Sequence, residues 1–494
     1  MLFNSYEFIF LFLPVAVVGF FLVSKWRHAA GTLWLVLTSL FFYGWWDARY
    51  VPLLCASIVF NYLVGGRLER LAGDDVISPG GHVSSRAGRR KGWLAFGIVV
   101  NVLLLGYFKY TDFFLGTANA IAGADVFSLP HIVLPLGISF FTFTQTAYLV
   151  DAYRGQARNA SFLTYCEFVT IFPHLIAGPI INHREMIPQF VADRTFSVRW
   201  DNMAKGLTIF LIGLFKKVYV ADGIAPWVNA AFAHADTLTF VDAWGGALGY
   251  TMQLYFDFSG YSEMAIGLGL MLNLRLPVNF DSPYQSLSVI DFWRRWHMTL
   301  GLWVKNYLYI PMGGGRAGVA RKMRNLFASM LIIGLWHGAG WTFVFWGGLH
   351  GVLLMINHLW RMTKIELPKV LCWVMTFLCV VVCWVFFRAE NFATAWKVLS
   401  AMADVRHIVL PLHHAQELGF LSPLGVTFAN LAPNALRHLA LLAGLTLVAA
   451  FVPNPLRWME RFRPNVVWLA CSLALGVVSL YYFSQLSDFL YFQF

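Results

Sequence analysis

The sequence predicts an all-α, polytopic integral membrane protein with about eleven transmembrane helices plus re-entrant and interfacial helices. Hydrophobic residues make up 59% of the 494-residue chain and charged residues only 12%, a composition that excludes a soluble domain of that size. The 20 tryptophans and 45 phenylalanines suit the interfaces of a bilayer. The formal net charge of +11 comes from Lys and Arg in short loops between apolar runs, so it indicates membrane topology before nucleic-acid binding.

A helix that crosses a bilayer needs about 20 mostly apolar residues. Runs of this kind lie at residues 7–24, 31–46, 51–66, 93–110, 132–150, 162–181, 206–222, 244–272, 326–357, 370–388, 438–453 and 465–483. Several are short or interrupted by Gly and Pro, so we expect some to be re-entrant, because non-helical backbone is tolerated at membrane depth only inside protein. No internal repeat is visible, and the chain is expected to form a single domain over residues 1–494.

The segment "DFWRRWHMTLGLWVKNYLYIPMGG", from Asp291, predicts a basic amphipathic helix. At helical spacing one face carries Trp293, Trp296, His297, Leu300, Trp303 and Tyr307. Arg294, Arg295 and Lys305 lie on other faces, and Arg316 follows in the next loop. The helix is either a plain anchor at the cytoplasmic interface or a site where these four cations bind the phosphates of a coenzyme or an acidic carrier protein.

The stretch "GLWHGAGWTFVFWGGLHG", residues 334–351, contains two histidines in an apolar region. The loops on both sides of it are basic and predicted to be cytoplasmic. A re-entrant hairpin, or two short passes broken at Gly338 and Gly340, therefore fits better than one straight helix. His337 is either a structural histidine bonded to a backbone carbonyl or a neutral general base for a hydroxyl that attacks an acyl thioester. For His350 a packing role is favoured.

Two carboxylates, Asp257 and Glu263, lie inside the apolar run "QLYFDFSGYSEMAIGLGL". We expect them to tie neighbouring helices together or to pair with arginines of the 291–305 segment. The six cysteines form no CxxC pair, so no metal site or disulfide framework is expected. The chain also has no G-x-S-x-G, Walker A or H-E-x-x-H motif.

A series of long motifs resembles, in order, those of the membrane-bound O-acyltransferase family. The motifs are "LPLGISFFTFTQTAYLVDAYRG", "FPHLIAGPI", "QLYFDFSGYSEMAIGLGLMLN", "FWRRWHMTLGLWVKNYLYIPMGG", "GLWHGAGWTFVFWGGLHG", "WVFFRAENF" and "FLYFQF". Within the family they are most similar to bacterial members that O-acetylate alginate. Asn306 stands where an Asp is expected, and the glycine loop "IPMGGGRAG" also departs from the usual pattern. Both departures bear on the polymer more than on the chemistry.

The resemblance implies a helical fold around a central funnel, in a multi-pass protein of the bacterial inner membrane. The family's catalytic histidine matches His337, and its second active-site position matches His297. The implied reaction takes an acetyl group from a cytoplasmic donor, acetyl-CoA, which is a co-substrate and not a bound cofactor. A periplasmic acetyltransferase partner then passes the group to a polysaccharide, alginate first and cellulose or peptidoglycan as alternatives. A lipid or solute transporter is the alternative from another class, since discontinuous helices are common there.

The terminal stretch "SDFLYFQF" carries one hydroxyl, on Tyr491. It resembles the terminal aromatic–tyrosine motif of a small peptide in teichoic-acid D-alanylation systems. By that resemblance Tyr491 is predicted to accept the acetyl group with His337 as base, because a tyrosine hydroxyl needs a neighbouring base to react. The alternative is an aromatic anchor at the membrane interface.

Overall fold

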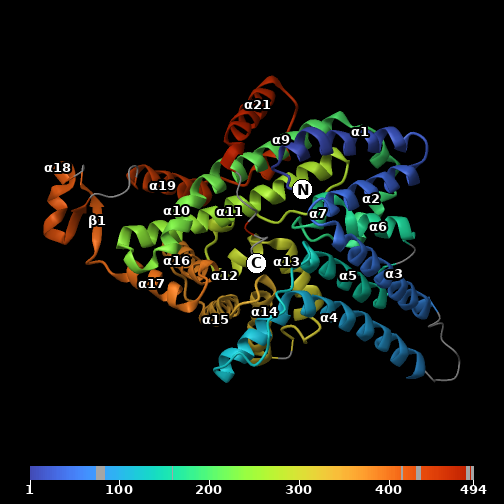
Figure 1. Ribbon diagram of the computed structural model, residues 1–494, viewed down its shortest axis with the longest axis horizontal. Helices are drawn as coiled ribbons and strands as arrows, with labels where there is room; N and C mark the ends of the chain where they lie inside the picture. The colour runs from blue at the N-terminus through green and yellow to red at the C-terminus, as the bar shows by residue number, and fades with distance from the viewer. Residues whose placement is uncertain are drawn as a thin grey trace. The chain divides into compact units, whose positions relative to one another are not determined.

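The computed structural model describes residues 1–73, 84–157, 160–316, 318–412, 415–429, 435–485 and 490, and these are helical almost throughout (Figure 1). Their contacts divide the chain into two compact units. Unit 1 comprises Met1–Gly213, Tyr261–Val278 and Phe462–Leu475, and unit 2 comprises Leu214–Gly260, Asn279–Arg461 and Gly476–Phe494. The expectation of a single domain stays a prediction.

Unit 1 contains the helices of the first part of the chain. They are η1 (Glu7–Phe12), α1 (Leu13–Ser24), α2 (His28–Gly44), η2 (Ala48–Tyr50), α3 (Val51–Gly73), α4 (Ser84–Ala122), α5 (Ile138–Tyr153), α6 (Phe162–Thr170), α7 (Phe172–Leu175), α8 (His183–Phe190), η3 (Asp193–Phe196) and most of α9 (Trp200–Phe215). A buried pair of amides joins α3 to α4, where Asn101 Nδ2 donates to Asn61 Oδ1 at 2.7 Å. Such side-chain hydrogen bonds help to hold helices together in membranes.

Unit 2 contains the elements that build the candidate site. They are η4 (Lys216–Ala221), α10 (Asp222–Ala233), η5 (Ala235–Thr237), the first part of α11 (Phe240–Met271), η6 (Pro283–Gln285), α12 (Val289–Arg295), α13 (Met298–Val304), η7 (Lys305–Tyr309), α14 (Val319–His337), α15 (Trp341–Thr363), α16 (Lys369–Arg388) and α17 (Phe392–Ala403). A short parallel pair of strands follows, in which β1 (Ile408–Pro411) pairs with β2 (Val426–Ala429) in the register Ile408 to Val426. Between and after these strands come α18 (Ala415–Leu418), η9 (Gly419–Leu424), α19 (Ala435–Phe451), α20 (Pro455–Met459), α21 (Val466–Tyr481, shared with unit 1) and η10 (Tyr482–Gln485).

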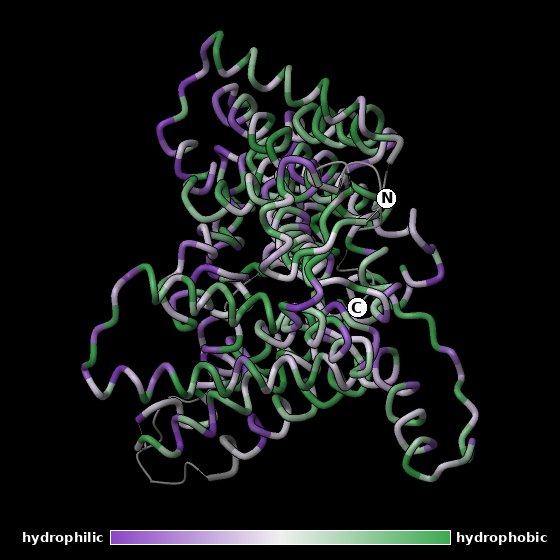
Figure 2. The backbone as a smooth tube through the Cα atoms, turned by 90° about the vertical axis from the view of Figure 1, so that its left-hand side faces the viewer, coloured by the Kyte–Doolittle hydropathy of each residue, from purple (hydrophilic) through white to green (hydrophobic). Residues whose placement is uncertain are grey.

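Five stretches of helix in the described residues are long and apolar enough to cross a membrane. They are Glu7–Ser24, Ala48–Ala72, Gly88–Ala122, Trp341–Thr363 and Lys369–Arg388. Figure 2 shows that apolar residues follow the helices and that many hydrophilic residues lie in the connecting segments. These stretches support the expected helical, multi-pass membrane protein. The number of eleven crossings and the central funnel stay predictions.

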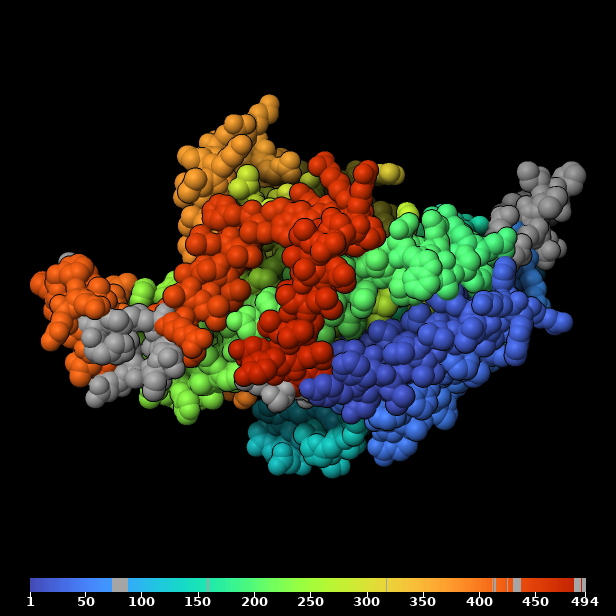
Figure 3. All heavy atoms as spheres, turned by 90° about the horizontal axis from the view of Figure 1, so that it is seen from above, coloured from blue at the N-terminus to red at the C-terminus, as the bar shows by residue number. Residues whose placement is uncertain are grey.

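Helix α21 illustrates how apolar side chains reach the outer surface. Figure 3 shows atoms of this C-terminal part of the chain, in red, on the visible surface. Val466, Val467 and Val477 are exposed over 80%, 70% and 67% of their surface. A helix whose valines face outward is suited to lipid, because hydrocarbon does not penalise exposed apolar side chains as water does.

The single amphipathic helix expected over residues 291–307 is wrong. Helix α12 ends at Arg295, α13 begins at Met298, and a π-helical turn, η7, follows from Lys305. Two backbone hydrogen bonds from the preceding segment hold the break open, Asp281 N–H to Arg295 O at 3.0 Å and Met298 N–H to Asn279 O at 2.9 Å. These two hydrogen bonds turn the chain at His297. The helical spacing of residues in the sequence cannot reveal them, because their partners lie in a loop outside the helix.

Candidate active site

The hairpin formed by α14 and α15 positions the first predicted histidine. The two helices lie side by side (Figure 1) and are separated at Gly338 and Gly340, which both have extended backbones. A Cβ atom on Gly334 would lie 2.3 Å from the carbonyl oxygen of Phe343, and one on Gly347 would lie 2.3 Å from the carbonyl oxygen of Met330. These glycines therefore let the two backbones touch. The predicted break at Gly338 and Gly340 is confirmed.

His337 is the last residue of α14, immediately before this break. Only 4% of its surface is exposed. The edge of its ring meets Trp346 of α15 at 5.2 Å between centroids and Phe387 of α16 at 5.3 Å. Residues of α14, α15 and α16 in unit 2 thus hold the ring against aromatic side chains.

His297 occupies the break between α12 and α13. It has a φ of 43°, in the left-handed region, which a residue with a Cβ adopts at a cost and which is frequent at functional sites. The ring is only 1% exposed and lies edge-on against Phe258 of α11 at 4.8 Å. Burial lowers its pKa to about 3, so the ring is neutral at pH 7. The ring is thus packed inside the protein, and its role in the reaction stays a prediction.

The structure brings the two predicted histidines together. Their ring centroids are 6.5 Å apart and their planes are inclined by 52°. Trp336 lies beside both, at 4.9 Å from the ring of His337 and 6.3 Å from that of His297. Two imidazole rings at this separation can accept a proton from one hydroxyl and orient a second reacting group.

His350 has a different surrounding, in keeping with the favoured packing role. It is completely buried, and its Nδ1 accepts a hydrogen bond from Trp293 Nε1 at 3.2 Å. Its ring also lies edge-on to Trp346 at 4.9 Å. His350 therefore orients Trp293, a residue that faces the adjacent cavity.

A cavity of about 480 Å³ lies within unit 2, and neither His297 nor His337 is among its lining residues. Its lining includes Met298, which follows His297, and Ile333, one helical turn before His337. The remaining apolar lining comes from Ile290, Trp293, Leu302, Val304, Leu326, Met330 and Leu354. This volume is within the range of small-molecule sites.

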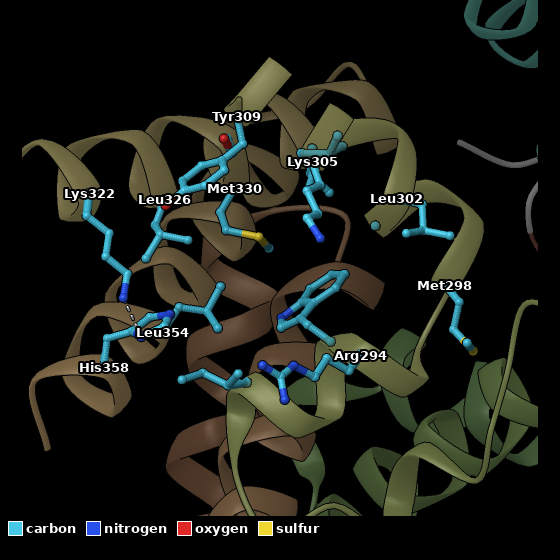
Figure 4. Close-up of a pocket in the computed structure, with 16 residues that line it drawn as sticks. Arg294, Met298, Leu302, Lys305, Tyr309, Lys322, Leu326, Met330, Leu354 and His358 are labelled. Carbon is cyan, nitrogen blue, oxygen red and sulfur yellow. Dashed lines mark hydrogen bonds between the residues drawn. The ribbon is translucent and has the colours of Figure 1, made fainter. Parts of the chain in front are cut away.

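Cations surround the cavity. Figure 4 shows Arg294 and Lys305 directed into one space and Lys322 joined to His358 at the other side. Lys322 Nζ lies 3.1 Å from His358 Nδ1. Among the described residues that line the cavity there is no Asp or Glu. An apolar chamber with three basic side chains suits a ligand that has a flexible body and anionic groups.

The four cations predicted from the sequence separate into two groups. Arg294 and Lys305 line the cavity. Arg295 instead donates from Nε to Asp291 Oδ1 at 3.1 Å, and neither it nor Arg316, which is exposed, is part of the lining. Among the described residues, no three His, Cys, Asp or Glu side chains gather as metal ligands.

Sequence reasoning missed Lys322 and His358, although the predicted hairpin contained the signal. In a hairpin that turns at 338–340, residues further from the turn on one helix face residues further from the turn on the other. Gly334 meets Gly347, and Lys322, further out, meets His358. Extending the predicted pairing outward from the turn would have found both residues.

Asp257 ties neighbouring elements, as one of the two expectations states. Its Oδ1 lies 2.6 Å from Lys217 Nζ of η4. The alternative expectation, that Asp257 pairs with an arginine of the 291–305 segment, is therefore wrong.

Tyr491, the predicted acyl acceptor, lies outside the described residues. Its neighbour Leu490 is described, and its backbone N–H donates to Asp257 Oδ2 at 3.2 Å.

Comparisons with known proteins identify the family. The sequence profile of the membrane-bound O-acyltransferase family matches residues 126–428, which include both histidines. The chain is 45% identical to a peptidoglycan O-acetyltransferase of Helicobacter pylori, over 83% of this chain and 81% of that protein. It is 44% identical to a probable alginate O-acetylase of Azotobacter vinelandii, over 81% and 78%, and 40% identical to one of Pseudomonas putida, over 100% of both. The chain is therefore a membrane O-acyltransferase and belongs to the membrane-bound O-acyltransferase family.

Proposed function

We propose that this enzyme moves an acetyl group from acetyl-CoA, on the cytoplasmic side of a bacterial inner membrane, toward an exported polysaccharide. The observation that carries the proposal is the pair of buried histidines beside a cavity lined by apolar residues and cations. Relatives named for alginate and for peptidoglycan support acetyl as the group. Alginate is the preferred polymer, because the chain matches one probable alginate O-acetylase over its whole length.

The donor is held by charge and by apolar contact. Arg294, Lys305 and Lys322 bind the phosphates of the coenzyme, since ammonium and guanidinium groups are the usual phosphate ligands. The acyl-bearing arm lies along the apolar lining, and this places the thioester near Met298 and Ile333, the lining residues next to the histidines.

The transfer then needs one base and one hydroxyl. His337 accepts the hydroxyl proton while the hydroxyl oxygen attacks the thioester carbonyl carbon, and the carbon–sulfur bond breaks. The proton on His337 passes to the departing thiolate, so that the products are an ester and a free thiol. His297 orients the reacting groups from the other side. The first hydroxyl is that of Tyr491, and a periplasmic partner takes the acetyl group onward to the polymer.

Replacement of His337 tests the proposal. We expect His337→Ala to lower polymer O-acetylation and release of coenzyme A thiol by at least about 100-fold, the usual contribution of a general base, with normal accumulation of protein in the membrane. His297→Ala is expected to lower both strongly but incompletely. Ester content of the polymer and thiol release from labelled acetyl-CoA are measured in isolated membranes. The matched control is His407→Ala, because His407 is an exposed histidine in unit 2.

The same assay separates the alternatives. Near-normal acetylation in His337→Ala would show that this residue is not the base. Tyr491→Phe keeps the ring and removes the hydroxyl, so wild-type acetylation in that variant would exclude a covalent relay. Loss of polymer export with intact acetyl transfer would favour a transporter.

A further inference from the structure

The cavity of unit 2 is lined by a histidine that the proposed chemistry does not use. His358 of α15 lies with Lys322 of α14 at the side of the cavity away from Arg294 and Lys305 (Figure 4). Lys322 Nζ is 3.1 Å from His358 Nδ1, which is a hydrogen-bond distance. The side chain of His358 is partly exposed, so its ring is accessible to a ligand in the cavity and to protons from solvent.

The hydrogen bond to Lys322 determines the protonation of His358 in the enzyme without ligand. A lysine ammonium group has three N–H donors and no acceptor. Nδ1 of His358 is therefore the acceptor, and the one proton of the ring lies on Nε2. The ring is neutral while Lys322 donates to it, and the lysine is directed toward the ring.

Positive charge predominates around His358. Three helices bring cations within electrostatic range of the ring, namely Lys322 of α14, Arg294 of α12 and Arg361 of α15 itself. The lining also contains the ammonium group of Lys305 and the phenol of Tyr309, and none of its described residues is an Asp or Glu. A phosphate group at this side of the cavity would therefore meet donors and no competing carboxylate of the lining.

A phosphate bound here would rearrange the pair. The ammonium group of Lys322 would donate to its oxygens, because a hydrogen bond between two ions is stronger than one to a neutral imidazole. Nδ1 of His358 would then lose its donor and could take up a proton from solvent. An anion close to an imidazole favours the charged form of the ring, which can donate to the phosphate as well. The pair thus carries one positive charge before binding and two after it.

We propose that Lys322 and His358 form a proton-linked phosphate clamp, in which the donor draws Lys322 from His358 onto a phosphate and His358 takes up a proton. The inference rests on the proposed function of the cavity as the acetyl-CoA site. It adds His358 to the three cations already assigned to the phosphates. The phosphate concerned is the diphosphate or the terminal phosphomonoester of coenzyme A.

The proton gives the affinity for the donor a definite pH dependence. A ligand that binds together with one proton binds more tightly as the pH falls, by at most about tenfold per pH unit. The ordinary pKa of histidine is about 6.5, so the effect belongs to the range from about pH 6 to pH 8.5. A phosphomonoester also titrates near pH 6. Wild type and a His358 variant are therefore compared at each pH, since the phosphate titrates equally with both.

Isothermal titration calorimetry of the full-length protein in detergent tests the clamp. Coenzyme A is the probe, and two buffers with different ionisation enthalpies reveal how many protons are taken up per molecule bound. We expect wild type to take up protons near pH 7 and His358→Gln, which keeps a neutral polar side chain, to take up fewer. The matched control is His407→Gln, because His407 is an exposed histidine of unit 2, and it should behave as wild type.

The dissociation constants provide a second measure. We expect the Kd of coenzyme A in His358→Gln to exceed that of wild type by about fivefold or more at about pH 6.5, within the limit set by one linked proton. The two values should converge at about pH 8.5, where the histidine of the wild type is neutral in the complex as well.

Replacement of Lys322 tests the clamp from the other side. Lys322→Met keeps the aliphatic stem and removes the donor to Nδ1 of His358. The ring can then take up its proton before the ligand arrives, so we expect binding to be weaker and to take up fewer protons than in wild type. Unchanged proton uptake in this variant would show that Lys322 does not control the ring, and the clamp would be wrong.

Dephospho-coenzyme A, which lacks the terminal phosphomonoester, identifies the phosphate. If the pH-dependent difference between wild type and His358→Gln persists with this probe, the clamp holds the diphosphate. If the difference disappears, the clamp holds the phosphomonoester.

The clamp and the proposed function fail separately. Equal proton uptake in wild type and His358→Gln would overturn the clamp while coenzyme A remains the ligand of the cavity. No binding of coenzyme A to wild type at any pH would overturn the donor and the clamp together. Proton uptake that depends on His358, in a protein whose His337→Ala variant still transfers acetyl groups normally, would support the clamp and contradict the proposed base.

Discussion

In the proposed reaction, single side chains decide how the donor is recognised. Arg294 and Lys305 point into the cavity (Figure 4), whereas Arg316 is exposed and is not part of the lining. All three carry the same charge, so net charge cannot distinguish their roles, but position can. Charge on the cavity wall acts on a ligand at short range, and charge in an exposed loop acts through screened solvent.

Charge reversal in the cavity should weaken donor binding specifically. Arg294→Glu and Lys305→Glu are each expected to raise the KM for acetyl-CoA at least tenfold, because a carboxylate repels the coenzyme phosphates. Arg316→Glu, the matched control, is expected to change the KM little. Initial rates of thiol release at low and high ionic strength measure the effect, which should shrink as salt rises. Defects of equal size at all salt concentrations would indicate lost packing and contradict a charge contact.

His297 shows what the sequence can and cannot reveal about a residue. Its motif pointed to an active-site role, but helical spacing placed it on the face of a continuous helix. Its observed place in a left-handed break depends on backbone hydrogen bonds from Asn279 and Asp281. Such long-range hydrogen bonds produce no periodic pattern in the sequence. The sequence could therefore identify His297 as a candidate, but it could not predict the backbone conformation around it.

At the scale of elements, the α14–α15 hairpin determines where His337 lies. The break was predictable, because Gly338 and Gly340 interrupt an apolar run between two basic loops. The closeness of the helices was not, since it depends on Gly334 meeting Gly347 across the hairpin. The sequence alone does not show that these two glycines pair, because their pairing follows only once the position of the turn is known.

A methyl group at this contact should separate the helices. Gly347→Ala would place Cβ 2.3 Å from a backbone oxygen, and overpacking of this kind typically costs about 1–3 kcal/mol. We expect activity to fall at least tenfold as His337 shifts, together with a lower thermal unfolding midpoint in detergent. Gly348→Ala is the control, because there the nearest atom is the side-chain Cδ2 of Leu331 at 3.5 Å, an ordinary contact. Similar behaviour of the two variants would show that the close approach does not position the site.

At the scale of the whole molecule, helical membrane character was the most predictable property. Apolar composition fixes it, and the five candidate crossings agree with runs marked in the sequence. The division into two compact units was not predictable, since each unit combines segments that are far apart along the chain. Hydropathy reports which residues avoid water, but it carries no information about which helices pack together.

The stability of the molecule should depend on the neutrality of His297. Burial lowers its pKa from 6.5 to about 3, so between these values the unfolded chain takes up a proton that the folded protein does not. The free energy of unfolding therefore falls with acidification, by at most about 1.4 kcal/mol per pH unit from this group. We expect the thermal unfolding midpoint to fall less between pH 7 and pH 4 in His297→Gln than in wild type. Parallel curves would show that the histidine is not buried in its neutral form.

The cavity and both histidines are built from residues 290–358, one uninterrupted stretch of chain. A single gene segment therefore encodes the residues that we propose to handle the donor, while Phe258 and Phe387, whose rings contact the two histidines, are encoded outside it. An insertion or deletion within this segment would disturb the cavity and the histidine pair together.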